Sequence, residues 1–200
     1  MAADLLLRKC AEDLLRDGAV HVHGVFKAKQ IASAIDAAMA SEPTGFESLM
    51  NKRYETFLDR SPAWDLLELA PDNFIRRLCS LIAEEDCSSL QSYRSSILEA
   101  KVGASQQKFH RDRGMCSTLP RLLYGFASPM KVPLHGATTT VIPGSHLPGS
   151  CDSEEWKVCM DEGDLLLFFG HVTHRGDANN ADKDRPLLTT LLDVNIPSLG

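Results

Sequence analysis

The C-terminal half of the chain, from Ser89 onward, consists of short runs rich in β-forming residues, with Gly, Pro, Asn and Asp between them. No helical period interrupts this succession. Many short strands without intervening helices predict a β-sandwich or barrel. The runs that we expect to form strands are residues 97–102, 106–110, 122–127, 138–142, 156–160, 164–170 and 187–194.

The N-terminal half has a different pattern. Apolar residues recur at helical spacing over 4–16, where Asp17-Gly18 is a plausible stop, and again over 27–40. Residues 19–26 largely alternate and predict a strand. The polar segment 42–62 is expected to be loop with short turns, and 64–84 one or two helices interrupted by Pro71.

These patterns together predict an α+β, mainly β chain. A helical layer, roughly residues 1–88, is expected to pack on one sheet of a C-terminal antiparallel double sheet, roughly residues 89–200. The 200 residues show no internal repeat, no low-complexity segment and no dividing linker, so a single domain is predicted.

Composition narrows the class of protein. The net charge of −6 argues against a nucleic-acid partner, and no stretch is long and apolar enough to cross a membrane. The N-terminus lacks the pattern of a signal peptide, and the six cysteines are scattered without a CxxC pair. These features predict a cytoplasmic protein with reduced thiols; the sequence makes no prediction of oligomeric state.

The run at 106–110 ends in His110, and Asp112 follows two residues later. In an extended chain, residues i and i+2 project to the same side, so one short segment can present an imidazole and a carboxylate to one ion. A His-x-Asp pair alone is weak evidence, because it occurs by chance in many proteins.

A second segment strengthens this interpretation. A turn at Glu162 leads into an apolar strand, His174 follows near its end, and the loop 175–184 leads to Arg185. Two imidazoles and one carboxylate are the ligand set of non-heme Fe(II) oxygenases. If the strands before and after this loop are antiparallel neighbours, His174 and Arg185 lie at the same end, where a guanidinium can grip a carboxylate.

The order and spacing of these motifs resemble the phytanoyl-CoA dioxygenase family of Fe(II)/2-oxoglutarate oxygenases. The matching residues are the opening 17–20, His110-x-Asp112, the Val-Ile-Pro-Gly-Ser-His segment 141–146, the Gly-Asp-Leu-Leu-Leu-Phe segment 163–168, His174 and Arg185. The resemblance implies a double-stranded β-helix, that is, a cupin-like jelly roll.

The resemblance also implies the chemistry. His110, Asp112 and His174 would be the catalytic iron ligands, and Arg185 would bind the C5 carboxylate of 2-oxoglutarate. The implied activity is a dioxygenase that uses Fe(II), 2-oxoglutarate and O2, hydroxylates a C–H bond of a small molecule, and releases succinate and CO2. The alternative is a non-catalytic jelly-roll module that binds metal or a partner.

The chain departs from the family pattern in two places. A small hydroxyl residue is common two positions after the distal histidine, where this chain has Gly176, and a neutral residue is common where it has Arg111. The chain is also short for the family. These departures concern the substrate more than the iron site.

Other histidines compete for these roles. His171 is a rival to His174, but the spacing to Arg185 favours His174. We expect His146 to belong to a structural turn, and the His21-x-His23 pair to bind no metal because no carboxylate is nearby.

Several further residues are candidates for the pocket. We expect Tyr124 to lie in the core or in the pocket wall, His135 to be exposed, and Lys101, Gln107 and Arg121 to be possible contacts of a substrate. A local excess of basic residues suggests that the substrate is a small anion. These residues are Arg111, Arg113, Arg121, Lys131 and Arg175.

Overall fold

The structure, a computed structural model, describes residues 2–40, 45–49, 51–58, 74–83, 91–112, 122–149 and 153–194. Its helices are α1 (Ala2–Asp17), α2 (Ala28–Ala40) and α4 (Phe74–Ala83). Its strands are β1 (Ala19–Val22), β2 (Gly45–Leu49), β3 (Arg53–Leu58), β4 (Gln91–Ala100), β5 (Leu122–Ala127), β6 (Thr139–Val141), β7 (Trp156–Val158), β8 (Leu165–Phe169), β9 (His174–Gly176) and β10 (Arg185–Asp193).

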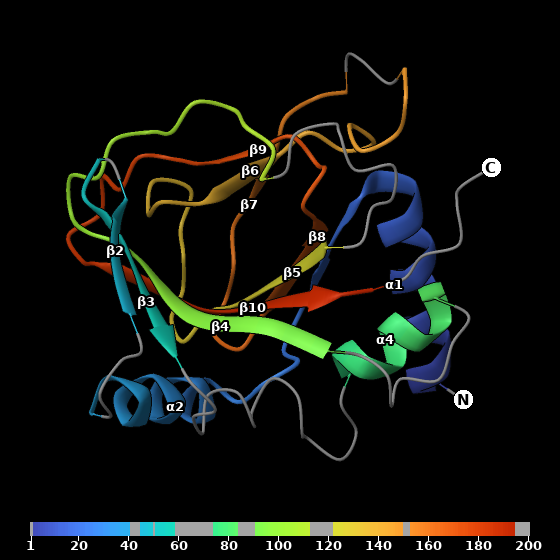
Figure 1. The fold of residues 1–200 in the computed structure, drawn as a ribbon, viewed down its shortest axis with the longest axis horizontal. Coiled ribbons are helices and arrows are strands. Elements are labelled where there is room, and N and C mark those ends of the chain that lie inside the picture. The colour runs from blue at the N-terminus through green and yellow to red at the C-terminus, as the bar shows by residue number, and fades with distance from the viewer. Residues whose placement is uncertain are drawn as a thin grey trace.

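The strands form two sheets (Figure 1). The larger sheet has the order β1-β8-β5-β10-β4-β3-β2, and the smaller one has the order β7-β6-β9. Every pairing between these strands is antiparallel. Consecutive strands β8, β9 and β10 alternate between the two sheets, which is the connectivity of a jelly roll.

The helices cover the ends and edge of the larger sheet. Figure 1 shows α1 and α4 side by side at one end, and α2 beneath the β2–β3 hairpin. Helix α1 ends at Asp17, and the amide of the next residue, Gly18, donates to the Leu14 carbonyl at 2.8 Å. A Cβ on Gly18 would lie 2.4 Å from both the His146 ring and the Val172 side chain, so glycine is required where the helix turns into β1.

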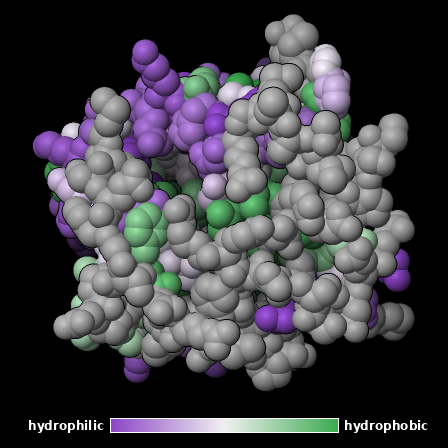
Figure 2. Space-filling view, in the orientation of Figure 1, coloured by the Kyte–Doolittle hydropathy of each residue, from purple (hydrophilic) through white to green (hydrophobic). Residues whose placement is uncertain are grey.

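The core of the fold is the buried strand β8, in which all five residues are inaccessible to solvent. Phe168 and Phe169 are both fully buried, and Trp156 packs against the same cluster. On the face shown in Figure 2, hydrophilic residues gather at the upper left and hydrophobic atoms lie near the middle. No described helix is long and apolar enough to span a membrane.

The expected strands over 122–127, 138–142, 156–160, 164–170 and 187–194 are confirmed with small changes of boundary, and the run at 97–102 extends back to Gln91. The run at 106–110 is wrong as a strand. It makes only separate hydrogen bonds with β9, such as Gln107 N to Gly176 O at 2.9 Å. Of the one or two helices predicted over 64–84, α4 confirms 74–83, and residues 64–73 and 84 lie outside the described part of the chain.

The expected loop at 42–62 is wrong, because β2 and β3 form a hairpin there that extends the larger sheet. Asn51 and Lys52 at its turn both have positive φ, 68° and 58°, in the left-handed region that many hairpin turns use. Both strands are rich in polar residues, so their alternation of apolar and polar positions was too weak to recognise. The loop expected over 175–184 is also wrong at its start, where β9 continues to Gly176.

Candidate metal centre

The backbone brings the two histidines of the predicted centre together. His110 and His174 form an isolated antiparallel bridge, in which each amide donates to the other residue's carbonyl at 2.9 Å. Paired residues of this kind project their side chains to the same face. The two imidazole rings accordingly lie with their centroids 4.5 Å apart.

Asp112 completes the group. Its Oδ1 lies 3.5 Å from Nε2 of His110, and its Oδ2 lies 3.6 Å from Nε2 of His174. These distances are too long for direct hydrogen bonds. They suit three atoms around one ion, since ligands about 2.1 Å from a metal lie about 3.0–3.4 Å from one another.

The tautomers of both histidines are preset. Nδ1 of His110 donates to the Lys108 carbonyl, and Nδ1 of His174 donates to the Val172 carbonyl, each at 2.9 Å. A proton fixed on Nδ1 leaves the lone pair of Nε2 for a metal. Burial lowers the pKa of His174, against the raising effect of Asp112, so that ring is held neutral, as a metal ligand must be.

Arg111, which stands between the two ligands of the first segment, binds the second segment. Its Nε donates to Oγ1 of Thr173 at 3.0 Å, and its Nη2 donates to the Ser145 carbonyl at 2.8 Å. The Ser145 hydroxyl in turn accepts from the amide of Thr173 at 2.8 Å. The cation at position 111 therefore ties the two ligand segments together and does not line the pocket.

A pocket of about 470 Å³ lies beside His110, Asp112 and His174, between the two sheets. Its walls follow the alternation of the strands, since β3, β5 and β10 each contribute residues of one face. The lining residues from these strands are Arg53, Glu55, Leu122, Tyr124, Phe126, Arg185, Thr189 and Leu191. The smaller sheet contributes Thr139, His174 and Gly176.

Two buried guanidinium groups lie in this pocket wall. Arg53 and Arg185 are both register partners of Ala100, one on either side of it in the sheet. They are 2% and 3% exposed, and neither forms a salt bridge with a described residue. Nε and Nη1 of Arg185 are buried without a hydrogen-bond partner within the described chain. Burial, and next the charge of Arg53, lowers the pKa of Arg185 to about 9, so the group still carries its charge at neutral pH.

Gly176 makes room for Arg53. A Cβ at position 176 would lie 2.8 Å from Nη1 of Arg53 and 2.7 Å from Oε1 of Gln107. Arg53 is held there by the carbonyl of Asp177, which accepts from its Nη2. Where the family commonly has a hydroxyl side chain, this chain therefore has a guanidinium from another strand.

The predicted site residues His110, Asp112, His174 and Arg185 all line the one pocket. The strand pairing expected to bring Arg185 to His174 is wrong, however. Strands β8 and β10 are not neighbours, because β5 lies between them, and His174 is in the other sheet. His174 and Arg185 meet because the sheets face one another across the pocket.

The other candidates are distributed differently. Tyr124 and Gln107 line the pocket, whereas His171 is not among its lining residues. His146 is structural, with Nε2 bound to the Leu15 carbonyl at 3.1 Å. Lys101 instead binds acidic side chains on the surface, and Arg121 lies outside the described residues. His135 is exposed, as expected.

Two features escaped the sequence analysis. Arg53 was missed because the β2–β3 hairpin was interpreted as loop; its signal was the Asn51-Lys52 turn. The expectation that no carboxylate lies near His21 and His23 was wrong, because Asp164 reaches both from a distant part of the chain.

Solved structures with the same fold include enzymes described as non-heme and alpha ketoglutarate dependent. SnoN, a non-heme alpha ketoglutarate dependent epimerase from nogalamycin biosynthesis, aligns with a TM-score of 0.76 at 20% identity over 98% of this chain and 92% of its own. SnoK, a carbocyclase of the same biosynthesis, aligns at 0.75 and 16% identity over 96% and 85%. AviO1 from Streptomyces viridochromogenes Tue57 aligns at 0.71 and 16% identity over 95% and 96%.

No match to the chain is found among curated protein sequences. The sequence model of the family described as Phytanoyl-CoA dioxygenase (PhyH) matches residues 14–187, which is most of the chain. With the jelly roll and the paired histidines already described, this match makes the chain a member of the phytanoyl-CoA dioxygenase family of iron- and 2-oxoglutarate-dependent oxygenases.

Proposed function

We propose that His110, Asp112 and His174 bind Fe(II), and that Arg185, assisted by Arg53, binds the distal carboxylate of 2-oxoglutarate. The enzyme hydroxylates a C–H bond of a small molecule and releases succinate and CO2. When bound, the iron and 2-oxoglutarate supply the oxidising chemistry with O2. The chain's own residues provide the ligand geometry, the charge and the pocket.

The donor set fits Fe(II). Two neutral imidazoles and one carboxylate leave one net positive charge on a divalent ion and several open positions. Because both Nδ1 protons are engaged by backbone carbonyls, neither His110 nor His174 has to change its tautomer to bind the metal. The carboxylate of Asp112 lies 3.5 and 3.6 Å from the two rings, which leaves space for the ion between the three groups.

One observation supports the proposed binding of 2-oxoglutarate by Arg185 more strongly than any other. Arg185 is buried beside the metal ligands, yet its Nε and Nη1 have no partner in the described chain. An unpaired buried charge is costly, and a carboxylate in a bidentate pair with the guanidinium would relieve it. The second cation, Arg53, adds to the attraction for a dianion.

The rest of the pocket favours an uncharged substrate. The basic residues that suggested an anionic one point elsewhere: Arg111 binds the ligand segments, Arg175 binds Glu155 and Asp177, and Lys131 binds Asp161. Arg113 and Arg121 lie outside the described residues. Among the other lining residues, five are apolar or aromatic, namely Leu98, Leu122, Tyr124, Phe126 and Leu191. The polar ones are Gln107, Thr139 and Thr189, and Glu55 is the one carboxylate besides Asp112. We therefore propose a small neutral molecule with an apolar body.

The experiment is anaerobic addition of Fe(II) and 2-oxoglutarate to the metal-free protein. We expect a weak visible charge-transfer band and, in air, release of succinate. The Asp112→Ala variant should lose both, because a metal ligand is missing. Asp182→Ala, which removes an exposed carboxylate that does not line the pocket, is the matched control and should retain both.

A wild-type protein that binds Fe(II) but gives neither the band nor succinate would be a non-catalytic module instead. Succinate release by Asp112→Ala at the wild-type rate would disprove the ligand assignment. Screening neutral and anionic small molecules for enhanced succinate release then tests the substrate class.

A further inference from the structure

A second group of metal-ligating side chains lies at the edge of the larger sheet. His21 is in β1, His23 follows that strand, and Asp164 immediately precedes β8. Strands β1 and β8 pair with Val22 opposite Leu165, so the antiparallel register carries His23 toward Asp164. None of the three residues lines the pocket beside His110 and His174.

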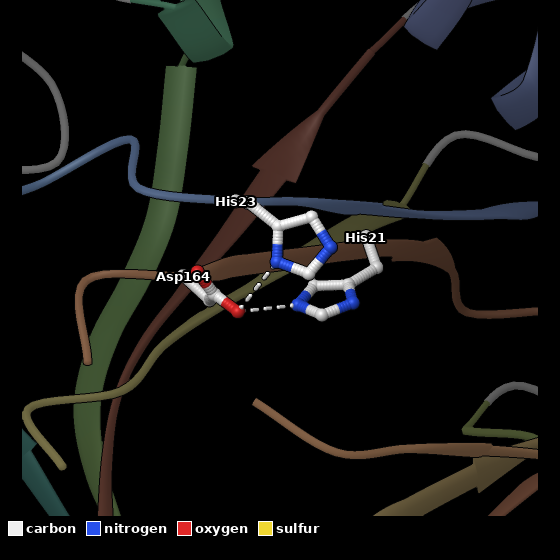
Figure 3. Close-up of side chains that lie close together, drawn as sticks. All are labelled: His21, His23 and Asp164. Atoms are coloured by element: carbon white, nitrogen blue, oxygen red, sulfur yellow. Dashed lines mark hydrogen bonds and ion pairs between the residues drawn. The ribbon is translucent and has the colours of Figure 1, made fainter. Parts of the chain in front are cut away.

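Both imidazoles point at one oxygen atom (Figure 3). Nε2 of His21 lies 2.8 Å and Nδ1 of His23 lies 3.0 Å from Oδ2 of Asp164. The ligand atoms of the three residues all lie within 4.8 Å of one another. The two rings pack against each other, with their centroids 4.3 Å apart.

The backbone fixes the carboxylate in this position. The Gly24 amide donates to Oδ1 of Asp164 at 2.9 Å, and the Asp161 amide donates to Oδ2 at 2.8 Å. Asp164 is 2% exposed, and its burial opposes ionisation. The hydrogen bonds from the two amides and the two histidines outweigh burial and lower the pKa of Asp164, so the carboxylate is charged at neutral pH.

Oδ2 of Asp164 thus faces three donors, two ring nitrogens and one amide, although a carboxylate oxygen has only two lone pairs. A divalent ion takes the place of both donated protons: each imidazole then carries its single proton on the other ring nitrogen and offers the freed lone pair as a ligand. The observed separations of 2.8 and 3.0 Å are near the roughly 3.0–3.4 Å expected between ligands of one ion, so small movements suffice.

Access and ligand type indicate which ion suits the group. The side chain of His23 is 75% exposed, whereas that of His21 is 10% exposed, so an ion can enter from solvent and keep a water ligand. Two imidazole nitrogens with a single carboxylate suit Zn²⁺, Co²⁺ or Cu²⁺, whereas Mg²⁺ and Ca²⁺ require a set of oxygen ligands.

We propose that His21, His23 and Asp164 form a second divalent transition-metal site, of the zinc type, separate from the iron centre. An ion there clamps the edge strand β1 and the residue after it to the start of β8. Because the three ligands come together only in the folded chain, the ion binds the folded state and stabilises it.

The test uses a variant that lacks the iron centre, His110→Ala/Asp112→Ala, so that failure of the proposed oxygenase activity does not affect the result. Metal-free protein is titrated with Zn²⁺ by calorimetry and with Co²⁺ by visible absorption. We expect one Zn²⁺ per chain, a Co²⁺ absorption band that Zn²⁺ abolishes, and a Tm raised by Zn²⁺ but not by Mg²⁺.

Adding His23→Ala to this variant should abolish the stoichiometric binding and the Tm shift. Because His23 is largely exposed, the protein should remain folded, which circular dichroism checks. His135→Ala removes another exposed histidine and should change neither result. Absence of Zn²⁺ binding at 100-fold molar excess, or binding that survives His23→Ala unchanged, overturns the proposal.

Discussion

Arg53 and Arg185 stand on either side of Ala100 in the larger sheet, and the charge of Arg53 adds to burial in lowering the pKa of Arg185. Both groups are buried, so their repulsion is only weakly screened by water. A dicarboxylate that enters the pocket relieves this repulsion. By the proposed role of Arg185, the arrangement lowers the stability of the ligand-free protein and raises its affinity for an anion.

Replacing Arg185 with methionine should therefore have opposite effects on binding and on stability. We expect 2-oxoglutarate binding to weaken at least 100-fold. The metal-free protein should be stabilised by roughly 1–3 kcal/mol, because a buried unpaired charge is removed. Calorimetry with 2-oxoglutarate and urea unfolding measure the two effects.

Arg185→Lys is the matched control, since it keeps the charge but lacks the planar fork. It should recover part of the binding and none of the stabilisation. A methionine variant that is less stable than wild type would show that Arg185 has a structural partner.

The contact between Gly176 and Arg53 can be tested with a double-mutant cycle. Gly176→Ala places a Cβ 2.8 Å from Nη1 of Arg53 and should displace the guanidinium. Each of Gly176→Ala and Arg53→Ala should raise the KM for 2-oxoglutarate by roughly 10- to 100-fold, the loss of one charged hydrogen bond. The double variant should be little worse than Arg53→Ala alone. Additive effects would mean that Gly176 acts through something other than Arg53.

Arg111 should influence the metal without touching it. Arg111→Met removes the hydrogen bonds to Thr173 and Ser145 that join the two ligand segments. We expect about tenfold weaker Fe(II) binding, measured by competition with a chelator. When both proteins are saturated with Fe(II), the variant and the wild type should have the same KM for 2-oxoglutarate. Arg16→Met, which removes an exposed arginine of α1, should leave the Fe(II) affinity as it is. Equal affinities in the two variants would remove Arg111 from its positioning role.

Asp177 should make the stability of the fold depend on pH. Burial raises its pKa, but the hydroxyls of Thr140 and Thr138 and the side chains of Arg175 and Gln106 outweigh this and lower the pKa below 3.8. A depressed folded-state pKa contributes stability above the unfolded value, and this stability is lost as pH falls through the folded value. The free energy of unfolding should therefore fall as the pH drops below about 4.

Asp177→Asn should cost roughly 2 kcal/mol at pH 7, because charged hydrogen bonds become neutral and one amide group faces donors. Its unfolding free energy should depend less on pH between 3 and 5 than that of wild type. Urea unfolding across this range measures both. Asp182→Asn, at an exposed position, should follow the wild-type curve; a parallel curve for Asp177→Asn would contradict the assignment.

The grouping of His110, Asp112 and His174 at one pocket could be predicted because the signals are local. His110 and Asp112 are two residues apart, and His174 follows a strand with an unmistakable apolar run. The β-rich half could be predicted for the same reason, since short strands between turn residues need no knowledge of distant contacts. Arg185 was correctly placed at the pocket although its strand neighbours were not.

The features that sequence reasoning missed depend on long-range pairing. Arg53 is a charged residue in a polar hairpin, and only its register with Ala100 brings it beside Arg185. Asp164 meets His21 and His23 across more than 140 positions of sequence, through the pairing of β1 with β8. The sequence pattern of one segment does not indicate which distant segment pairs with it.

The bridge between His110 and His174 is made by peptide groups, which every amino acid other than proline possesses. The frame of the centre is thus independent of which side chains occupy it. Substitutions can therefore change or remove one of the side chains at the centre while the two backbone segments keep their place. One scaffold can in this way acquire different oxidative outcomes through single replacements, without inventing another fold.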